Sequence, residues 1–222
     1  MNIHSTYTLP SEASSRFKAG SIGEKNQQKV LEAALTVFSR KGFSGARIDE
    51  IAKEAGMSKT NMLYYFKTKK ELYQVVIVRV LRRWLGSLGD LHSHDQPIDV
   101  ITQYISKKMQ LSRQYPEASR LIAMEIIAGA PIIDNFMQTE LRSWVKEKGE
   151  VFSVWQKEGL MAPIDPAHVF FMIWALTQTY ADFESQISAV MEPKNYEKEI
   201  YPRATGYVIE VLVRGLGLKT RL

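Results

Sequence analysis

Cysteine is absent from the 222 residues, and other residues that commonly build reactive centres are scarce. Without cysteine the chain has no disulfides, no thiolate metal ligands and no cysteine nucleophile. Only four histidines occur, and two of them, His92 and His94, fall in a predicted turn without the helical spacing of metal ligands. A solvated loop is therefore expected there, in preference to a metal site.

Long hydrophobic runs are also missing. No stretch approaches the roughly 18 consecutive apolar residues of a membrane-spanning helix, and the start lacks a charged segment followed by an apolar one. We therefore expect a cytoplasmic protein without a membrane partner. No glycine-rich phosphate loop or nucleophile elbow occurs, so we expect no cofactor and no enzymatic activity. A helical enzyme with an incidental basic N-terminus is the alternative class.

The net charge of +5 is unevenly distributed along the chain. Residues 25–84 contain 13 basic and 5 acidic side chains, a net charge of +8. Residues 85–222 contain 14 basic and 17 acidic side chains, a net charge of −3. A basic segment joined to a slightly acidic one is typical of a polyanion-binding module attached to a second domain. Charge alone does not identify the polyanion.

Helical periodicity is clear over residues 25–84. Apolar residues recur at three- and four-residue spacing from Lys25 until Gly42, which is a helix-stop signal. Further apolar stripes predict helices at residues 48–55, 58–66 and 68–84. Thr68 and Glu71 form a capping-box pattern at the start of the last of these helices.

The block from Ile48 to Phe66 has the composition of a helix-turn-helix. Ala52 permits close approach of its two helices, and Gly56 permits the backbone reversal between them. Met57, Met62 and Phe66 can hold the second helix by apolar contacts, which leaves the opposite face of that helix free. A helix inserted into the major groove reads base edges with residues of its first turn. The block therefore predicts binding to double-stranded operator DNA.

The second helix of this motif supplies the candidate DNA contacts. Ser58 can cap the helix, and Asn61 is the preferred base reader because an amide can bond adenine in bidentate fashion. Nearby hydroxyl and cationic groups can donate to phosphates, which position the protein without specifying sequence. Tyr64 or Tyr65 could instead pack against a neighbouring helix. The candidate DNA-binding residues are Arg47, Ser58, Lys59, Thr60, Asn61, Tyr64, Tyr65, Lys67 and Lys69.

Five short motifs characterise residues 24–84: Lys41-Gly42-Phe43, Ile51-Ala52, Ala55-Gly56-Met57-Ser58, Leu63-Tyr64-Tyr65-Phe66 and Lys69-Lys70-Glu71-Leu72. Together they resemble the TetR family of one-component transcription regulators. The resemblance implies an N-terminal DNA-binding domain, a larger helical domain that binds a small-molecule effector, and a homodimer. The chain is therefore expected to regulate transcription, as a repressor or an activator, under control of a ligand.

The remainder of the chain is also predicted to be helical, because no alternating strand pattern occurs. Glycine and proline mark turns at residues 86–97, 115–116, 129–131, 159–166, 192–193 and 201–202. We therefore predict an all-α fold. Its first predicted part is a flexible tail at 1–23, in which Arg16 and Lys18 could reach a DNA groove or stay solvated. A three-helix helix-turn-helix domain with a fourth connecting helix follows at 24–84, and its motif spans about 47–66. An effector-binding and dimerisation domain is predicted at 85–222.

A second set of motifs extends the resemblance almost to the C-terminus: Gln114–Leu121, Met124-Glu125, Ala128–Pro131, Ala162–Pro166, Phe171–Ala175, Gln178 and Tyr180–Phe183. These segments look like the branch of the TetR family that senses uracil or thymine and controls pyrimidine and nitrogen metabolism. The resemblance implies a pyrimidine base as the effector. It also implies that residues 165–191 and 193–217 form a four-helix bundle between two subunits.

The segment from Trp174 to Phe183 supplies candidate ligand contacts. Trp174, Gln178 and Asp182 are spaced i, i+4, i+8 and therefore share one helix face. A pyrimidine needs apolar walls together with groups that donate and accept, which an indole, an amide and a carboxylate provide. Phe183 and Met124 are further wall candidates. The amide and carboxylate could instead bond across a dimer interface, and the effector could be a different hydrophobic drug or metabolite.

Overall fold

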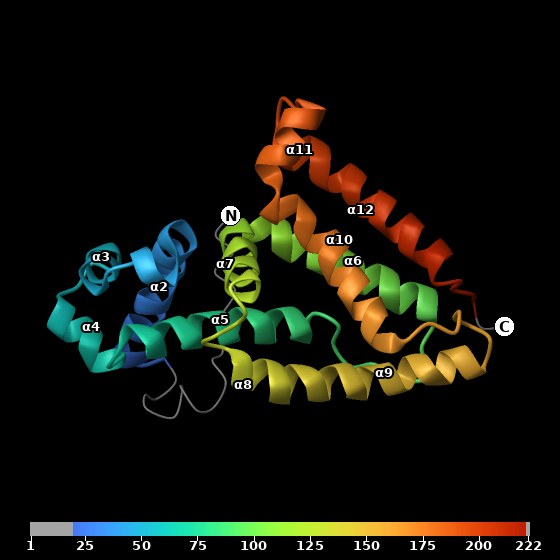
Figure 1. Cartoon of the computed structure of the whole chain (residues 1–222), viewed down its shortest axis with the longest axis horizontal. Helices are drawn as coiled ribbons and strands as arrows, with labels where there is room; N and C mark the ends of the chain where they lie inside the picture. The colour runs from blue at the N-terminus through green and yellow to red at the C-terminus, as the bar shows by residue number, and fades with distance from the viewer. Residues whose placement is uncertain (1–19, 221–222) are drawn as a thin grey trace. The chain divides into compact units, whose positions relative to one another are not determined.

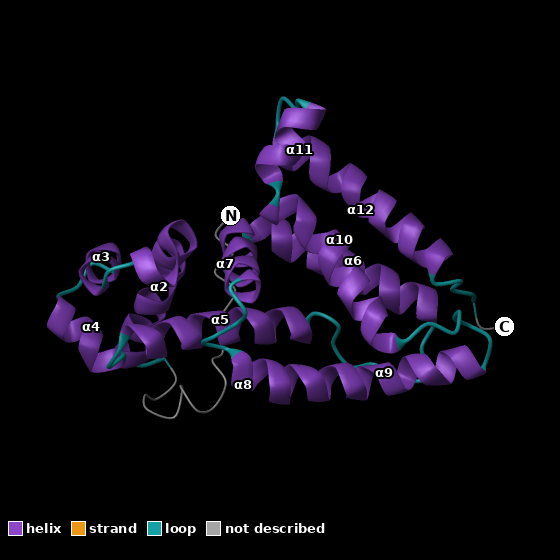
Figure 2. Ribbon diagram, viewed as in Figure 1, coloured by secondary structure: helices purple, strands orange, loops and turns teal. Residues whose placement is uncertain are grey.

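The computed structural model describes residues 20–220, which form helices joined by loops (Figure 2). No β-strand occurs within these residues, so the all-α prediction is confirmed. The chain divides into two compact units between Val80 and Leu81. The predicted tail up to residue 19 lies outside the described residues, and so do Arg16 and Lys18.

The N-terminal unit contains α2 (Ile22–Gly45), α3 (Ile48–Glu54), α4 (Lys59–Tyr65) and the first part of α5 (Lys69–Gly86) (Figure 1). α2 starts before the predicted Lys25, because the Ser21 hydroxyl caps the helix by accepting from the Glu24 N–H at 3.2 Å. Gly42 interrupts the helix with a φ of +65°, a left-handed conformation that glycine adopts without steric cost. The predicted stop signal therefore acts within α2, and one further turn follows it.

The apolar stripes predicted in this unit form its core. Gly56, with a φ of +67°, makes the predicted reversal between α3 and α4. The start of α5 is capped as predicted, because the Thr68 hydroxyl accepts from the Glu71 N–H at 3.1 Å. The fully buried core residues of this unit include Val30, Ala34, Phe38, Ile51, Met62, Leu72 and Ile77.

The C-terminal unit contains the end of α5, then α6 (Pro97–Gln114), α7 (Pro116–Ile127), α8 (Asp134–Phe136), the π-helical turn η1 (Met137–Leu141), α9 (Arg142–Lys157), α10 (Pro166–Asp182), α11 (Glu184–Met191) and α12 (Tyr196–Gly215). The predicted helix over 165–191 is broken at Phe183, whose ψ of 31° is non-helical. The turn predicted at Tyr201-Pro202 is wrong, because Pro202 lies inside α12. The buried side chains of Tyr201 and Ala204 keep this helix packed despite the missing N–H.

α6 and α10 lie at the centre of this unit. α6 packs against α10 and α12, while α7 and α9 pack against α10 (Figure 1). Aromatic side chains fill the space between them, among them Phe152, Trp155 and Phe170, which are fully buried. Gly149 permits the close approach of α9 and the start of α10, since a Cβ there would lie 2.9 Å from Pro166 Cβ. No helix in the described part of the chain is long and apolar enough to cross a membrane.

Candidate functional site

α4 presents its first turn to solvent. The Ser58 backbone is extended, and its hydroxyl accepts from the Asn61 N–H at 3.1 Å, so the predicted cap is confirmed. The side chains of Lys59, Thr60 and Asn61 are all exposed. The buried Met62 fixes the opposite side of this helix in the core, which orients the first turn outward.

Donor groups continue along the exposed face of α4. Tyr64 is 54% exposed and lies one turn beyond Thr60 and Asn61, so the three residues share a face. The Lys67 ammonium lies 6.0 Å from the centre of the Tyr64 ring. Lys59 Nζ lies 3.1 Å from Asp49 Oδ1 in an exposed ion pair, which a phosphate could replace at small cost. This face can supply amide, hydroxyl and ammonium donors to a polyanion.

Tyr65 does not share this exposure, which corrects the expectation that its hydroxyl is available to a phosphate. Only 7% of the residue is exposed, and its hydroxyl accepts from Asn26 Nδ2 at 3.2 Å. Neighbouring residues on a helix point about 100° apart, so Tyr64 faces solvent while Tyr65 faces α2. The alternative of packing against a neighbouring helix therefore holds for Tyr65 and not for Tyr64.

Lys69 and Arg47 are placed differently from the residues of α4. The Lys69 ammonium donates to the Ala46 carbonyl at 3.1 Å and lies 4.6 Å from the centre of the Phe43 ring. Lys69 therefore joins α5 to the segment between α2 and α3, in addition to carrying a positive charge. Arg47 precedes α3, and its backbone N–H donates to the Glu50 carboxylate at 3.3 Å while its side chain stays exposed.

A cavity of about 270 Å³ lies within the C-terminal unit. Pockets for drug-sized ligands run from roughly 300 to 1,000 Å³, so this cavity suits a compact ligand. Its wall includes part of η1, and π-helical turns often occur at functional sites. The lining residues are Leu81, Trp84 and Leu85 of α5, Lys108 of α6, Ile122 and Ile126 of α7, Met137 and Leu141 of η1, and Phe171, Trp174 and Gln178 of α10.

Two of the predicted ligand contacts meet at this cavity. Trp174 and Gln178 both line it, one helical turn apart on α10. The Trp174 Nε1–H donates to the buried Tyr104 hydroxyl at 2.8 Å, which fixes the plane of the indole. No hydrogen bond to the Gln178 side chain is found among the described residues. Its amide is therefore available to a ligand as donor and acceptor.

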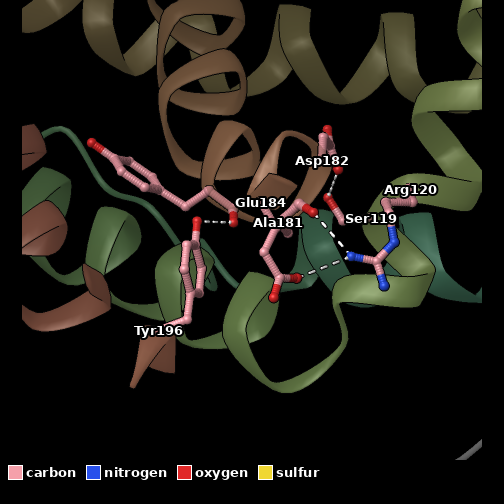
Figure 3. A network of polar contacts seen from close by, with 7 residues as sticks. Ser119, Arg120, Ala181, Asp182, Glu184 and Tyr196 are labelled. Carbon is pink, nitrogen blue, oxygen red and sulfur yellow. Dashed lines mark hydrogen bonds and ion pairs between the residues drawn. The ribbon is translucent and has the colours of Figure 1, made fainter. Parts of the chain in front are cut away.

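The other three predicted contacts do not line the cavity, which corrects their expected placement. Asp182 accepts from the Ser119 hydroxyl at 2.5 Å, and burial raises the pKa of this carboxyl (Figure 3). Asp182 is the last residue of α10 and lies beyond the cavity. Phe183 follows that helix end and is 53% exposed, and Met124 is 41% exposed on α7. Helical spacing correctly placed Asp182 on the face of α10 that carries Trp174 and Gln178, but it did not show that this face extends beyond the cavity.

A polar network fixes the junction of α10 with α11 (Figure 3). The Arg120 guanidinium donates to the Ala181 carbonyl at 3.1 Å and lies 3.5 Å from Glu184. The Tyr196 hydroxyl donates to the Tyr180 carbonyl at 2.7 Å. These bonds hold α7 and α12 to the end of α10 and therefore set the position of its inner face.

Lys108 is a further polar residue of the cavity wall and was not among the contacts predicted from the sequence. It is 2% exposed, and its ammonium lies 4.2 Å from the centre of the Trp84 ring. Burial lowers the pKa of Lys108 to about 7, although the negative charge of Asp182 acts in the opposite direction. A signal was present in the sequence, because Lys108 lies on the helical stripe of Ile101 and Ile105, where an apolar residue is expected.

Two families match the chain, and together they cover most of it. Residues 30–76 match the family described as bacterial regulatory proteins of the tetR family. Residues 77–219 match the family described as the C-terminal region of YcdC-like proteins. The first match contains the exposed face of α4, and the second contains the whole cavity.

Curated relatives agree with these families. The HTH-type transcriptional regulator RutR of Escherichia coli O157:H7 is 41% identical over 190 residues, which cover 86% of this chain and 90% of that protein. RutR of strain K12 is 40% identical over the same length. The negative transcriptional regulator IcaR of the biofilm operon icaADBC in Staphylococcus epidermidis is 21% identical over 187 residues, or 79% of this chain and 95% of that protein.

Solved structures share the fold. SCO4942 of Streptomyces coelicolor has a TM-score of 0.69 at 23% identity, covering 87% of this chain and 99% of that one. A TetR-like transcriptional regulator of Rhodococcus sp. RHA1 has a TM-score of 0.62 at 20% identity, covering 87% and 97%. At these identities the similarity concerns the fold alone.

Proposed function

The chain belongs to the TetR family of bacterial transcriptional regulators, and from this premise we propose that it binds operator DNA as a homodimer under control of a pyrimidine base. The observation that carries the proposal is the small cavity of the C-terminal unit, where the Gln178 amide meets apolar and aromatic walls. The ligand would act in the cytoplasm by changing the affinity of the dimer for its operator.

The exposed face of α4 supports DNA binding in the major groove. Asn61 is the proposed base reader, and the hydroxyl and ammonium groups of Thr60, Tyr64 and Lys67 are proposed to bind phosphates. Lys59 would exchange Asp49 for a phosphate. Tyr65 is left out because it is buried, and Lys69 is expected to act mainly by holding α5 to the Ala46 carbonyl.

Exposed apolar side chains on the last helices support a homodimer. A monomer rarely exposes large contiguous apolar patches, so such residues mark a surface that a partner covers. The exposed Phe183 fits this role better than its predicted role as a ligand contact. The exposed large hydrophobic residues of α10, α11 and α12, with the residue between α10 and α11, are Phe171, Met172, Phe183, Val190, Met191, Tyr207 and Val211.

Footprinting with sedimentation tests the DNA-binding proposal. Two recognition helices of a two-fold dimer enter successive major grooves about 34 to 36 Å apart, so a pseudo-palindromic site should be protected in two halves. Val211→Glu should shift the protein to monomer and weaken operator binding, whereas Lys107→Glu, at an exposed position of α6, should not change the oligomeric state. Protection of a single half-site by a monomeric protein would contradict the proposal.

A pyrimidine base fits the chemistry of the cavity. Uracil and thymine are flat rings with two carbonyl acceptors and two N–H donors, which match an amide that both donates and accepts. Trp84, Phe171 and Trp174 offer aromatic surfaces for such a ring. The same apolar wall would also accept a different small metabolite, so a thermal-shift screen should include metabolites without an imide edge.

Calorimetry with Gln178→Leu tests the pyrimidine proposal. Uracil or thymine should bind the parent protein and change its operator affinity by about 1–3 kcal/mol, the usual range of allosteric coupling. The variant keeps bulk but removes the amide, so a bound base would lose its partner and the response should disappear. Gln110→Leu makes the same replacement at an exposed position of α6, away from the cavity, and should respond normally. Absence of binding by the parent protein would refute a pyrimidine effector.

A further inference from the structure

One positive charge faces the cavity from within the core. Lys108 lines the cavity with Gln178 and Trp84, and only 2% of the residue is exposed. Its Nζ lies over the Trp84 ring, and no hydrogen bond or ion pair to this ammonium occurs among residues 20–220. A buried ammonium is costly unless something replaces its water, and an aromatic face compensates only in part.

We propose that the Lys108 ammonium is the cationic contact of the ligand, donating to a carbonyl oxygen of the bound base, so that ligand binding captures a proton. The inference rests on the proposed function and identifies a further determinant of specificity at the same site. The Lys108 ammonium would select ligands that present an oxygen acceptor toward α6, because an ammonium donates and cannot accept.

The charged groups considered around Lys108 do not form a hydrogen bond with its ammonium. Asp182 on α10 is the acidic group that acts on it, but Asp182 already accepts from Ser119 and is opposed by Arg120 of α7. On α12, burial and nearby negative charges, among them Asp182, raise the pKa of Tyr201, so this hydroxyl carries no charge at neutral pH. On α5, Arg83 precedes Trp84 in the sequence and lies over the Tyr115 ring, 4.4 Å from its centre. These groups do not supply the hydrogen bond that a ligand oxygen would.

The proton balance follows from the sign of the pKa change. Burial lowers the pKa of Lys108 in the free protein to about 7, and a hydrogen bond from the ammonium to a ligand oxygen raises it again. Above pH 7 the free protein has lost this proton and must regain it on binding. Affinity for uracil, which is neutral in this range, should therefore fall about tenfold per pH unit above 7 and stay constant below it.

Calorimetry of uracil binding in buffers of different ionisation enthalpy measures the captured protons directly. With a free pKa of about 7, binding should take up most of a proton at pH 8 and little at pH 6. Lys108→Arg keeps the charge at both pH values and should bind without proton uptake. Lys108→Met should bind at least tenfold more weakly at pH 6. Lys107→Met, the exposed neighbour, should match the parent protein.

The outcomes separate the two proposals. If the parent protein binds neither base at pH 6 or 8, the pyrimidine effector and the role of Lys108 both fail. If it binds uracil without proton uptake at pH 8, the role of Lys108 is overturned and the pyrimidine effector survives. Proton uptake that persists in Lys108→Arg but vanishes in Asp182→Asn would assign the proton to Asp182 and equally overturn the inference. The number of protons that the parent protein takes up on binding uracil tests the role of Lys108 even if Lys108→Met fails to fold.

Discussion

The two candidate sites of this protein are assembled in opposite ways. The proposed DNA contacts of the N-terminal unit lie within residues 58–67, on α4 and the loop that follows it, and face solvent. The cavity of the C-terminal unit takes its wall from α5, α6, α7, η1 and α10, between Leu81 and Gln178. One site is a continuous stretch of chain, and the other exists only where five elements meet.

The difference reflects what each ligand requires. A helix that reads a groove needs a row of exposed donors, which the spacing of residues on one helix provides. A small base must be enclosed from several sides, which no single helix can achieve. The DNA-binding surface should therefore depend on its cap and turn, whereas the cavity should depend on the core behind it.

The largest expected effect concerns the dependence of the cavity on the core of the C-terminal unit. This dependence would be refuted if a large core side chain could be removed without loss of stability or ligand binding. Trp155 is fully buried, stacks on Phe152 with ring centres 5.4 Å apart, and donates its Nε1–H to the Ser93 carbonyl at 2.9 Å. Trp155→Ala should lower the free energy of unfolding by about 3–5 kcal/mol, measured by urea denaturation, and weaken ligand binding. Ile127→Ala, at an 81% exposed position, should change it by less than about 0.5 kcal/mol. Equal effects of the two variants would refute the dependence on the core.

The packing of α9 against α10 offers a finer test. A methyl group at Gly149 would lie 2.9 Å from Pro166 Cβ, so Gly149→Ala should force the helices apart at a cost of about 1–3 kcal/mol. Because α10 carries Trp174 and Gln178, ligand affinity measured by calorimetry should fall as well. Gly86→Ala, with no atom within 4 Å of the added methyl group, is the matched control. Normal stability and affinity in Gly149→Ala would show that the cavity tolerates movement of α10.

On the DNA-binding surface, we expect substitutions of single residues to have separable effects. Asn61→Ala should lose about 1–3 kcal/mol of discrimination at particular base pairs. Lys67→Ala should weaken binding to all sequences alike and reduce the salt dependence. Selection from randomised duplexes distinguishes the two. The assignment of Asn61 is refuted if its variant retains the parental sequence preference.

The smallest expected effect concerns the cap of α4. Ser58→Ala removes the acceptor of the Asn61 N–H and should cost about 1 kcal/mol of stability, measured by urea denaturation. Operator affinity should fall because the first turn is less well ordered, whereas uracil affinity should stay unchanged. Ser58→Asp preserves an acceptor and should retain the stability. A fall in uracil affinity with Ser58→Ala would contradict the local character of the DNA-binding surface.

The sequence alone predicted the helices of the N-terminal unit and most turns of the C-terminal unit. Gly56, Ser58 and Thr68 act through hydrogen bonds and backbone angles within a few residues, so their roles are visible in the chain itself. The turn predicted at Pro202 was wrong for a different reason. Packing of Tyr201 and Ala204 keeps α12 helical there, and such long-range stabilisation leaves no local signal.

The candidate contacts divide in the same way. Helical spacing was enough to place Asn61 and Tyr64 on an exposed face and to bring Trp174 and Gln178 together on α10. Only the tertiary structure decided which residues are buried and how deep they lie. It turned Tyr65 toward Asn26 and placed Asp182 beyond the cavity.

Lys108 shows the physical reason for this limit. Its place in an apolar stripe of α6 was readable, but its burial depends on helices brought together from distant parts of the chain. The sequence determines which groups share a helix face, because the period of a helix is fixed by its backbone hydrogen bonds. Whether such a face meets solvent, core or cavity depends on packing between helices, and this packing placed the Lys108 ammonium beside Trp84.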